Sequence, residues 1–176
     1  MQYRLKKYLR RISFILAVII FASACVRKGV PVIEAAKCAE VSPQAIKKIN
    51  WTRVPEVNVR IRNDQFEPMV IKLRQGWPYI MKIRNRDAGP HVFNSYGFFT
   101  NVAVNKITLN GKRIEQTCVA AIRIEAREMA TIRFVAAIDG RYEFEDKSID
   151  VPFVFSSGAA GVIEIEERGR APIANQ

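Results

Sequence analysis

Histidine and cysteine are scarce in this sequence, which has 1 His and 3 Cys among its 176 residues. A metal cage built from several histidines is therefore excluded. Any Ser-His-Asp or Cys-His catalytic machinery would have to use the one histidine, His91. Gly-rich phosphate loops, Cys-x-x-Cys pairs and the spacing of calcium loops are also absent. These absences leave little chemistry for catalysis, and we expect a protein that is not an enzyme.

Long apolar runs are also rare, and the most prominent one covers residues 12–24. Its 13 residues would extend about 20 Å as a helix, which is short of the ~30 Å hydrocarbon core of a bilayer. Five basic residues precede the run, and the small residues Ala22, Ser23 and Ala24 end it. This pattern predicts a signal peptide over residues 1–24 rather than a helix of the folded domain.

Cys25 directly follows the predicted signal peptide, and Ala22-Ser23-Ala24-Cys25 is similar to a bacterial lipobox, with Ala22 where Leu is usual. The similarity predicts a lipid on Cys25, although plain cleavage before Cys25 would use the same small residues. Arg10-Arg11 leaves twin-arginine export open beside the general route. We expect an exported, periplasmic lipoprotein that is held at a membrane through Cys25.

Positive charge exceeds negative charge, with 28 Lys+Arg against 17 Asp+Glu and a net charge of +11. Loss of residues 1–24 removes five positive charges and leaves +6. The remaining basic residues alternate along expected strands: Arg60, Arg62, Lys72, Arg74, Lys82 and Arg84. Such a face is either simply solvated or a docking surface for an acidic protein partner or an anionic membrane. We do not expect nucleic acid as a partner.

Cys38 and Cys118 form an even pair once Cys25 carries lipid. An exported protein meets an oxidising compartment, so the sequence predicts a disulfide between them, with two unpaired thiols as the alternative. A disulfide would tie the N-terminal segment to the body of the protein. It would stabilise the fold by roughly 3–5 kcal/mol.

The mature chain divides into three parts by its patterning. Residues 25–54 predict a leader or linker, with a short helix starting near Ser42-Pro43-Gln44. Residues 55–167 show apolar residues at every second position, which is typical of half-buried antiparallel strands in an all-β sandwich. Residues 168–176 predict a flexible tail. The segment 97–106 breaks the alternation and is either a short helix or a long lid.

Four segments of residues 57–166 resemble cupredoxin-like domains in their motifs and in their order. The first is Phe66-Glu67-Pro68 with Ile71 and Gly76, and the second is Asn85-Arg86-Asp87 followed by His91-Val92-Phe93. The third is Gly140-Arg141-Tyr142-Glu143-Phe144, and the fourth is Gly158-Ala159-Ala160-Gly161 followed by Val162-Ile163-Glu164-Ile165. The resemblance implies a Greek-key β-sandwich. It also implies a copper site made by a His, a Cys, a second His and usually a Met.

The copper ligands of that family are mostly missing here. His91 matches the first His, but Asp146 stands at the position of the Cys and Ala159 at that of the Met. The chain has no second histidine, so an ordinary blue-copper electron-transfer site is excluded. The resemblance therefore implies copper chemistry only through an atypical site.

Other residues around His91 offer substitutes for the missing ligands. His91 with Asp146, joined by Asp150 or Glu145, would form a hard nitrogen and oxygen site suited to Cu(II) or Zn(II). Asp146 could equally be a turn residue facing water, and His91 a hydrogen-bonded structural residue. Three methionines and one cysteine are soft donors for Cu(I): Met69, Met81, Met129 and an unpaired Cys118. Core packing explains Met69 and Met81 better because they follow the apolar alternation.

Two functions therefore stay open. One is copper handling in the periplasm through an atypical site at His91 and Asp146, with a copper ion as the ligand. The alternative is a metal-free interaction module that has lost the copper site and contacts its partner through the basic strand faces or the 97–106 segment.

Overall fold

The computed structural model describes residues 32–35, 37–39, 43–147 and 159–169. The predicted signal peptide, the lipidation site at Cys25 and the substitute ligand Asp150 lie outside these residues. Among the described residues, no helix is both long enough and apolar enough to cross a membrane.

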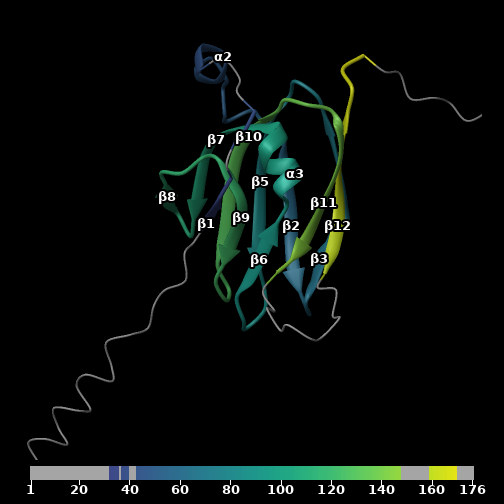
Figure 1. Ribbon diagram of the computed structural model, residues 1–176. Helices are drawn as coiled ribbons and strands as arrows, with labels where there is room; N and C mark the ends of the chain where they lie inside the picture. The colour runs from purple at the N-terminus through teal and green to yellow at the C-terminus, as the bar shows by residue number, and fades with distance from the viewer. Residues whose placement is uncertain (1–31, 36, 40–42, 148–158, 170–176) are drawn as a thin grey trace, which may run out of the picture.

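Strands dominate the described residues, and they form two sheets of a sandwich (Figure 1). One sheet has the order β1-β9-β6-β11-β12-β4, and the other has the order β3-β2-β5-β10-β7-β8. The strands of the first sheet are β1 (Val32–Glu34), β4 (Val70–Arg74), β6 (His91–Asn94), β9 (Val119–Ile124), β11 (Gly140–Asp146) and β12 (Ala160–Glu166). Those of the second are β2 (Glu56–Arg62), β3 (Gln65–Glu67), β5 (Pro78–Asn85), β7 (Val102–Leu109), β8 (Lys112–Ile114) and β10 (Met129–Ala136). The predicted all-β sandwich is confirmed.

Two neighbouring strand pairs are parallel, whereas the sequence predicts antiparallel strands throughout. β2 pairs with β5, and β4 pairs with β12, in parallel. The chain crosses from β3 to β4 in the opposite sheet and then back to β5. Because of this crossing, β5 returns beside β2 in the same direction instead of folding back as a hairpin.

Alternating apolar residues build the core between the sheets. In β2, Val59 and Ile61 are buried while Arg60 and Arg62 are exposed, as the two-residue period predicts. Met81 is also buried, in β5, but Met69 is 61% exposed. The expectation of core packing for Met69 is wrong, because Met69 precedes the first residue of β4 and is not part of the strand.

Three phenylalanines from the resemblance motifs meet in the core. Phe66, Phe93 and Phe144 are each at most 2% exposed, and their ring centroids lie 5.0–5.6 Å apart. Gly161 lies opposite Phe144 in the ladder between β11 and β12. A Cβ atom on Gly161 would lie 2.2 Å from Cζ of Phe144 and 2.4 Å from the carbonyl oxygen of Met69. The glycine therefore makes room for the aromatic ring.

The segment 97–106 contains most of a short helix and the first part of a strand. Helix α3 (Tyr96–Asn101) leads directly into β7, and its Phe98 and Phe99 side chains are fully buried. The Phe98 ring packs against Phe134 of β10 with centroids 5.2 Å apart. This segment is thus part of the core, because two aromatic side chains anchor it, and the structure does not show a lid here.

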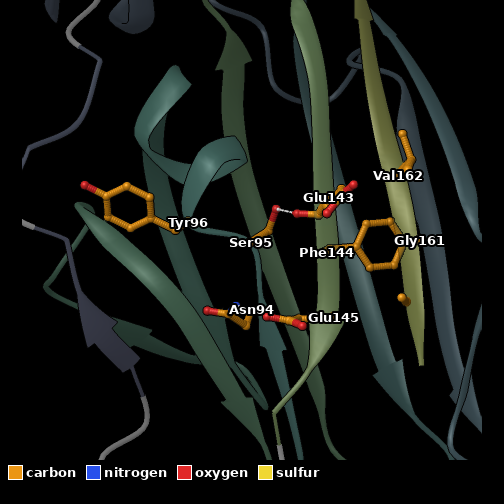
Figure 2. A pocket seen from close by; sticks show the side chains of 9 residues that line it. Asn94, Ser95, Tyr96, Glu143, Phe144, Glu145, Gly161 and Val162 are labelled. Carbon is orange, nitrogen blue, oxygen red and sulfur yellow. Dashed lines mark hydrogen bonds between the residues drawn. The ribbon is translucent and has the colours of Figure 1, made fainter. Parts of the chain in front are cut away.

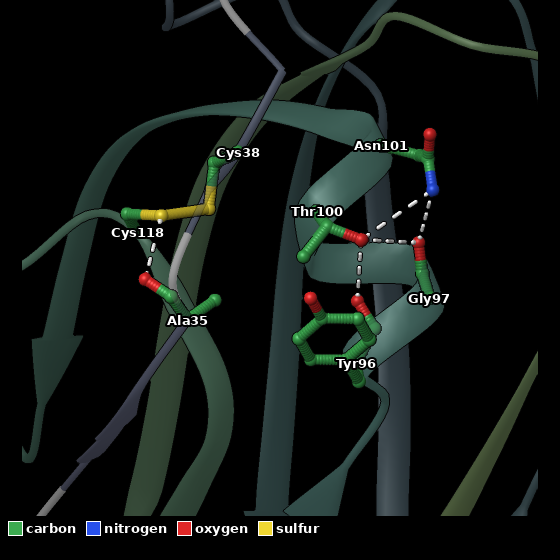
Figure 3. Close-up of a disulfide and its surroundings, with 7 residues drawn as sticks. All are labelled: Ala35, Cys38, Tyr96, Gly97, Thr100, Asn101 and Cys118. Carbon is green, nitrogen blue, oxygen red and sulfur yellow. Dashed lines mark hydrogen bonds between the residues drawn. A yellow bond between two sulfur atoms is a disulfide. The ribbon is translucent and has the colours of Figure 1, made fainter.

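The predicted leader at residues 25–54 is partly built into the sandwich. Its residues Val32–Glu34 form β1 and pair with β9, so the first sheet starts well before residue 55. The predicted short helix is α2 (Pro43–Lys47). Figure 3 shows Cys38 and Cys118 joined by a disulfide beside α3. Their Cα atoms are 5.6 Å apart. The backbone N–H of Ala39 also donates to the carbonyl of Thr100 at 2.7 Å. These contacts tie the segment to the body.

Candidate metal site

Asn85 organises the loop that leads to His91. Its side chain is fully buried at the end of β5, and its amide nitrogen donates to three carbonyl oxygens at 2.8–3.1 Å, those of Gly89, Ile124 and Glu125. Its side-chain oxygen accepts from the backbone N–H of Asp87 at 2.8 Å. A buried amide with all these partners holds the loop in one conformation. The backbone of the loop that carries Asp87 and leads to His91 is therefore fixed.

Asp87 is also held by the turn between β2 and β3. Asn63 and Asp64 form this turn with φ angles of 52° and 55°, the left-handed conformation that short hairpin turns require. Their backbone N–H groups donate to the two carboxylate oxygens of Asp87 at 2.9 and 3.1 Å. The turn thus fixes the carboxylate of Asp87 and places the side chain of Asp64 beside it.

His91 begins β6 and is 3% exposed. Its Nδ1 atom lies 2.5 Å from Oδ2 of Asp146, the last residue of β11. Its Nε2 atom lies 3.1 Å from Oδ2 of Asp87 and 3.9 Å from Oδ1 of Asp64. Each ring nitrogen therefore has a carboxylate oxygen as its partner.

Asp146 is fixed by the backbone as well as by His91. Its side chain is 5% exposed, and its Oδ1 atom accepts from the N–H of Val92 at 2.9 Å. The alternative of a turn residue facing water is wrong, because the last residue of β11 turns its side chain toward the start of β6. A carboxylate buried in this way fixes the orientation of the imidazole ring.

The carboxyl group of Asp87 titrates below its ordinary range. Burial raises its pKa, but the hydrogen bonds from the N–H groups of Asp64 and Asn63 and the proximity of His91 lower it further than burial raises it. The net shift is downward, so Asp87 stays ionised at neutral pH. A carboxylate in this state can serve as a cation ligand.

The side chains of Asp64, Asp87 and His91 can converge on one ion. One ligand atom from each lies within 4.8 Å of the others. Tetrahedral coordination with bonds of about 2.0–2.1 Å places ligand atoms roughly 3.3 Å apart. The separations of 3.1 and 3.9 Å from Nε2 to the two carboxylates are close to this value. Small side-chain rotations would complete such a set, and Asp64 is 83% exposed at its side chain, which gives an ion access.

The predicted metal pair His91 and Asp146 meets in the structure, although 55 residues separate the two in the chain. The 2.5 Å contact between Nδ1 and Oδ2 leaves no room for an ion between these atoms, because ligand atoms around one metal lie roughly 3 Å apart or more. Asp146 fits the role of a ring-orienting partner better than that of a direct ligand. The pair as metal ligands stays a prediction.

Sequence reasoning missed Asp64 and Asp87 as ligand candidates. Both residues lie in segments that it singled out, since Asn63-Asp64 is a turn signal and Asp87 belongs to a resemblance motif. The turn at residue 64 and the loop at residue 87 belong to different parts of the second sheet. Only the parallel pairing of β2 with β5 brings them together.

Three of the other predicted donors are placed elsewhere, and Asp150 lies outside the described residues. Glu145 is exposed and accepts from the side-chain amide of Asn94 at 3.0 Å, and Cys118 is consumed by the disulfide. Met81 is fully buried in the core. With Asp146 at the thiolate position and Ala159 at the thioether position, the residues present do not fit a blue-copper centre.

A hollow of about 400 Å³ lies on the first sheet where α3 begins. Figure 2 shows Glu143 and Glu145 of β11 between Asn94, Ser95 and Tyr96 on one side and Gly161 and Val162 of β12 on the other. The hydroxyl of Ser95 donates to the carbonyl of Glu143 at 2.6 Å. This acidic hollow is separate from the residues that surround His91.

Structural comparison matches the chain to copper proteins at low sequence identity. A multicopper oxidase from Pseudomonas thermotolerans is 18% identical, with a TM-score of 0.49 over 66% of this chain and 31% of that chain. Auracyanin B is 12% identical, with a TM-score of 0.46 over 78% of this chain and 99% of its own. Auracyanin A, a "blue" copper protein from Chloroflexus aurantiacus, is 11% identical, with a TM-score of 0.42 over 63% of this chain and 98% of its own.

The chain is an all-β sandwich of two sheets that resembles these copper proteins. It spans less than half the length of the multicopper oxidases that it matches, with 31%, 44% and 32% of three of them covered. No family model matches the sequence, and no curated protein matches it.

Proposed function

We propose that this cupredoxin-like protein binds a divalent transition metal ion, either Cu(II) or Zn(II). The ligands are His91 through Nε2 and the carboxylates of Asp87 and Asp64. The observation that carries the proposal is the convergence of these three groups within 4.8 Å. A ligand set of one imidazole and two carboxylates suits Cu(II) and Zn(II) better than Cu(I).

Asp146 supports this site without binding the ion. It holds the Nδ1 side of His91 at 2.5 Å and turns Nε2 toward Asp87 and Asp64. A carboxylate behind a metal-binding imidazole orients the ring and increases its basicity. The protein in this proposal takes up or hands over a metal ion and does not transfer electrons through a blue-copper centre.

The site favours binding over catalysis. With Nε2 of His91 bound to the metal ion and Nδ1 facing Asp146, neither nitrogen of the single histidine is left to act as a general base on a substrate. We infer that the protein is a metal carrier or sensor and not an enzyme.

Titration calorimetry and paramagnetic resonance with Cu(II) test the proposal. The wild-type protein should bind one equivalent, with a spectrum typical of nitrogen and oxygen ligands. Asp64→Asn should weaken binding at least about tenfold, because loss of even a supporting group behind a metal ligand typically costs about 10–100-fold in affinity. Because the side chain of Asp64 is exposed, this variant should keep its thermal stability.

Glu67→Gln is the matched control for Asp64→Asn. It removes a carboxylate from the same hairpin, but Glu67 pairs with Arg60 at 3.3 Å and lies outside the ligand group. Its Cu(II) affinity should stay at the wild-type value. Equal binding by Asp64→Asn and the wild type, or no binding by either, would contradict the proposal.

The alternative is a metal-free interaction module. The observation that favours it is the pairing of both ring nitrogens of His91 with carboxylates, which stabilises the cluster without an ion. Under this alternative, Cu(II) and Zn(II) leave the melting temperature unchanged. Under the metal proposal they raise it, because a ligand that binds only the folded state stabilises that state.

We further propose export to the periplasm and anchoring through a lipid on Cys25. The basic and apolar pattern of residues 1–24 supports export, and the disulfide between Cys38 and Cys118 suits an oxidising compartment. Mass spectrometry of the membrane fraction should find a lipid on Cys25. Cys25→Ser should release the protein into the soluble fraction, and continued membrane association without lipid would contradict the anchor.

A further inference from the structure

Two adjoining hollows lie on the outer face of the second sheet, over β2 and β5. Their volumes are about 760 and 470 Å³, and both are lined by Arg60, Glu67 and Arg86. We call the combined surface the arginine groove, which is defined by the basic residues Arg60, Arg62, Lys82, Arg84, Arg86 and Arg127. The smaller hollow is also lined by Asp87, so the groove adjoins the proposed metal site, but its basic residues are not among the proposed ligands.

The strand pairing places like charges next to each other in this groove. Arg60 of β2 lies directly opposite Arg84 of β5 in the parallel ladder. The alternation of the strands turns both side chains away from the core, and both are exposed. Like charges on neighbouring strands destabilise a sheet. The arrangement therefore does not serve stability.

Carboxylates neutralise only part of the groove. Arg60 pairs with Glu67 at 3.3 Å, and Lys82 pairs with Glu56 at 2.7 Å. Within the described ranges, the other four basic residues have no carboxylate within 4.0 Å: Arg62, Arg84, Arg86 and Arg127. The groove thus keeps an uncompensated positive charge inside a concave surface, where the field of neighbouring charges adds up.

We propose that the arginine groove is the docking surface for an acidic segment of a partner protein. The guanidinium group carries a planar fork of donors that pairs with carboxylates through two parallel hydrogen bonds, and five of the six basic residues here are arginines. Pro68 and Met129 add apolar surface to the larger hollow. A protein segment with clustered Asp and Glu matches both the charge and the apolar patches. A flat membrane surface does not fill a hollow.

Fluorescence anisotropy with a labelled oligo-glutamate peptide tests the docking surface on the full chain. The wild type should bind the peptide, and added salt should weaken the binding because it screens the charges. The double reversal Arg62→Glu with Arg84→Glu should lower the affinity at least about tenfold, since it places like charges against the peptide. These side chains are exposed, so the melting temperature should not fall.

Arg113→Glu with Arg141→Glu is the matched control, with the same change of net charge at exposed positions outside the groove. It should lower the affinity less than about threefold, because only the long-range field changes. An equal loss in the two double variants overturns the proposal, as does the absence of peptide binding.

Two further measurements separate other occupants from the acidic protein segment. Groove-dependent binding to phosphatidylglycerol vesicles, without binding to the peptide, overturns the proposal and assigns the surface to a membrane. Groove-dependent self-association in sedimentation overturns it in favour of a second copy of this chain, which carries the acidic hollow at Glu143 and Glu145. Asp64→Asn should leave peptide binding unchanged, so the docking surface and the metal site fail or hold independently.

Discussion

The cluster around His91 and the arginine groove differ in the burial and in the partners of their charged groups. His91 is 3% exposed, and Asp146 and Asp87 face its two ring nitrogens. Arg62 and Arg84 are exposed and have no carboxylate within 4.0 Å among the described residues. A buried charge is costly unless it is paired, whereas water solvates an exposed one. The pairing at His91 is thus demanded by the fold, but the arginines are not explained by folding.

Asp146→Ala should give the largest change in the free energy of unfolding. The change leaves Nδ1 of His91 and the N–H of Val92 without their carboxylate partner in a buried place. Each buried hydrogen-bonding group that is left without its partner costs about 1–3 kcal/mol. Urea denaturation should therefore show a free energy of unfolding lower by that amount for each of the two groups.

Glu145→Ala is the control for Asp146→Ala, because it changes the neighbouring carboxylate on the exposed face of β11. Glu145 contacts Asn94 and Lys147 at exposed positions, so its loss should cost at most about 1 kcal/mol. Similar losses of unfolding free energy in the two variants would show that burial does not make Asp146 more important for stability than Glu145.

Asp87 should make stability depend on pH. Its pKa is lowered in the folded protein, so the unfolded chain takes up its proton first as the pH falls. The stabilisation is present above the ordinary pKa of about 3.9 and is lost as the pH falls through the lower folded value. Thermal melting between neutral and acid pH should show a steeper loss for the wild type than for Asp87→Asn.

One result would contradict this role of the charge on Asp87. If the difference in melting temperature between the wild type and Asp87→Asn stays constant as the pH falls, the carboxylate of Asp87 does not contribute through its charge. The contribution would then come from hydrogen-bond geometry alone, which the Asn side chain partly keeps.

Arg84→Thr should give the smallest change in the free energy of unfolding, and this change should have the opposite sign. It removes a like charge opposite Arg60 and introduces a residue that suits strands, so it should raise stability by about 0.2–1 kcal/mol. Arg141→Thr is the control, because Arg141 is exposed but has Glu164 at 3.7 Å. Urea denaturation should show no gain for Arg141→Thr, and a loss of stability in Arg84→Thr would indicate a structural role for the groove.

Much of the sandwich could be predicted from local patterns. The two-residue alternation predicted over residues 55–167 is seen in β2, β5 and β10, because an apolar face must turn toward the core at every second residue. Short or fully buried strands were harder to find. In β9, Ala120 and Ala121 are both buried, and β1 has only three residues. Alternation fails where both faces are covered, and a three-residue strand carries too little pattern.

The site was only partly predictable. The resemblance motifs pointed to His91 and to the position of Asp146, and the structure brings the two together across 55 residues. The sequence, however, offered no reason to connect Asp64 with Asp87. The contact between their segments depends on a turn whose backbone N–H groups bind a carboxylate from another loop.

The sequence by itself determined the all-β class, the faces of the long strands and the loss of the blue-copper ligands, because residue identity and local periodicity decide these properties. Only the tertiary structure decided which charged residues are neighbours. The parallel pairing of β2 with β5 sets Arg60 against Arg84, and the crossing of the chain between the sheets brings the turn at Asp64 to His91. Such contacts join residues far apart in the chain, and local patterns carry no information about them.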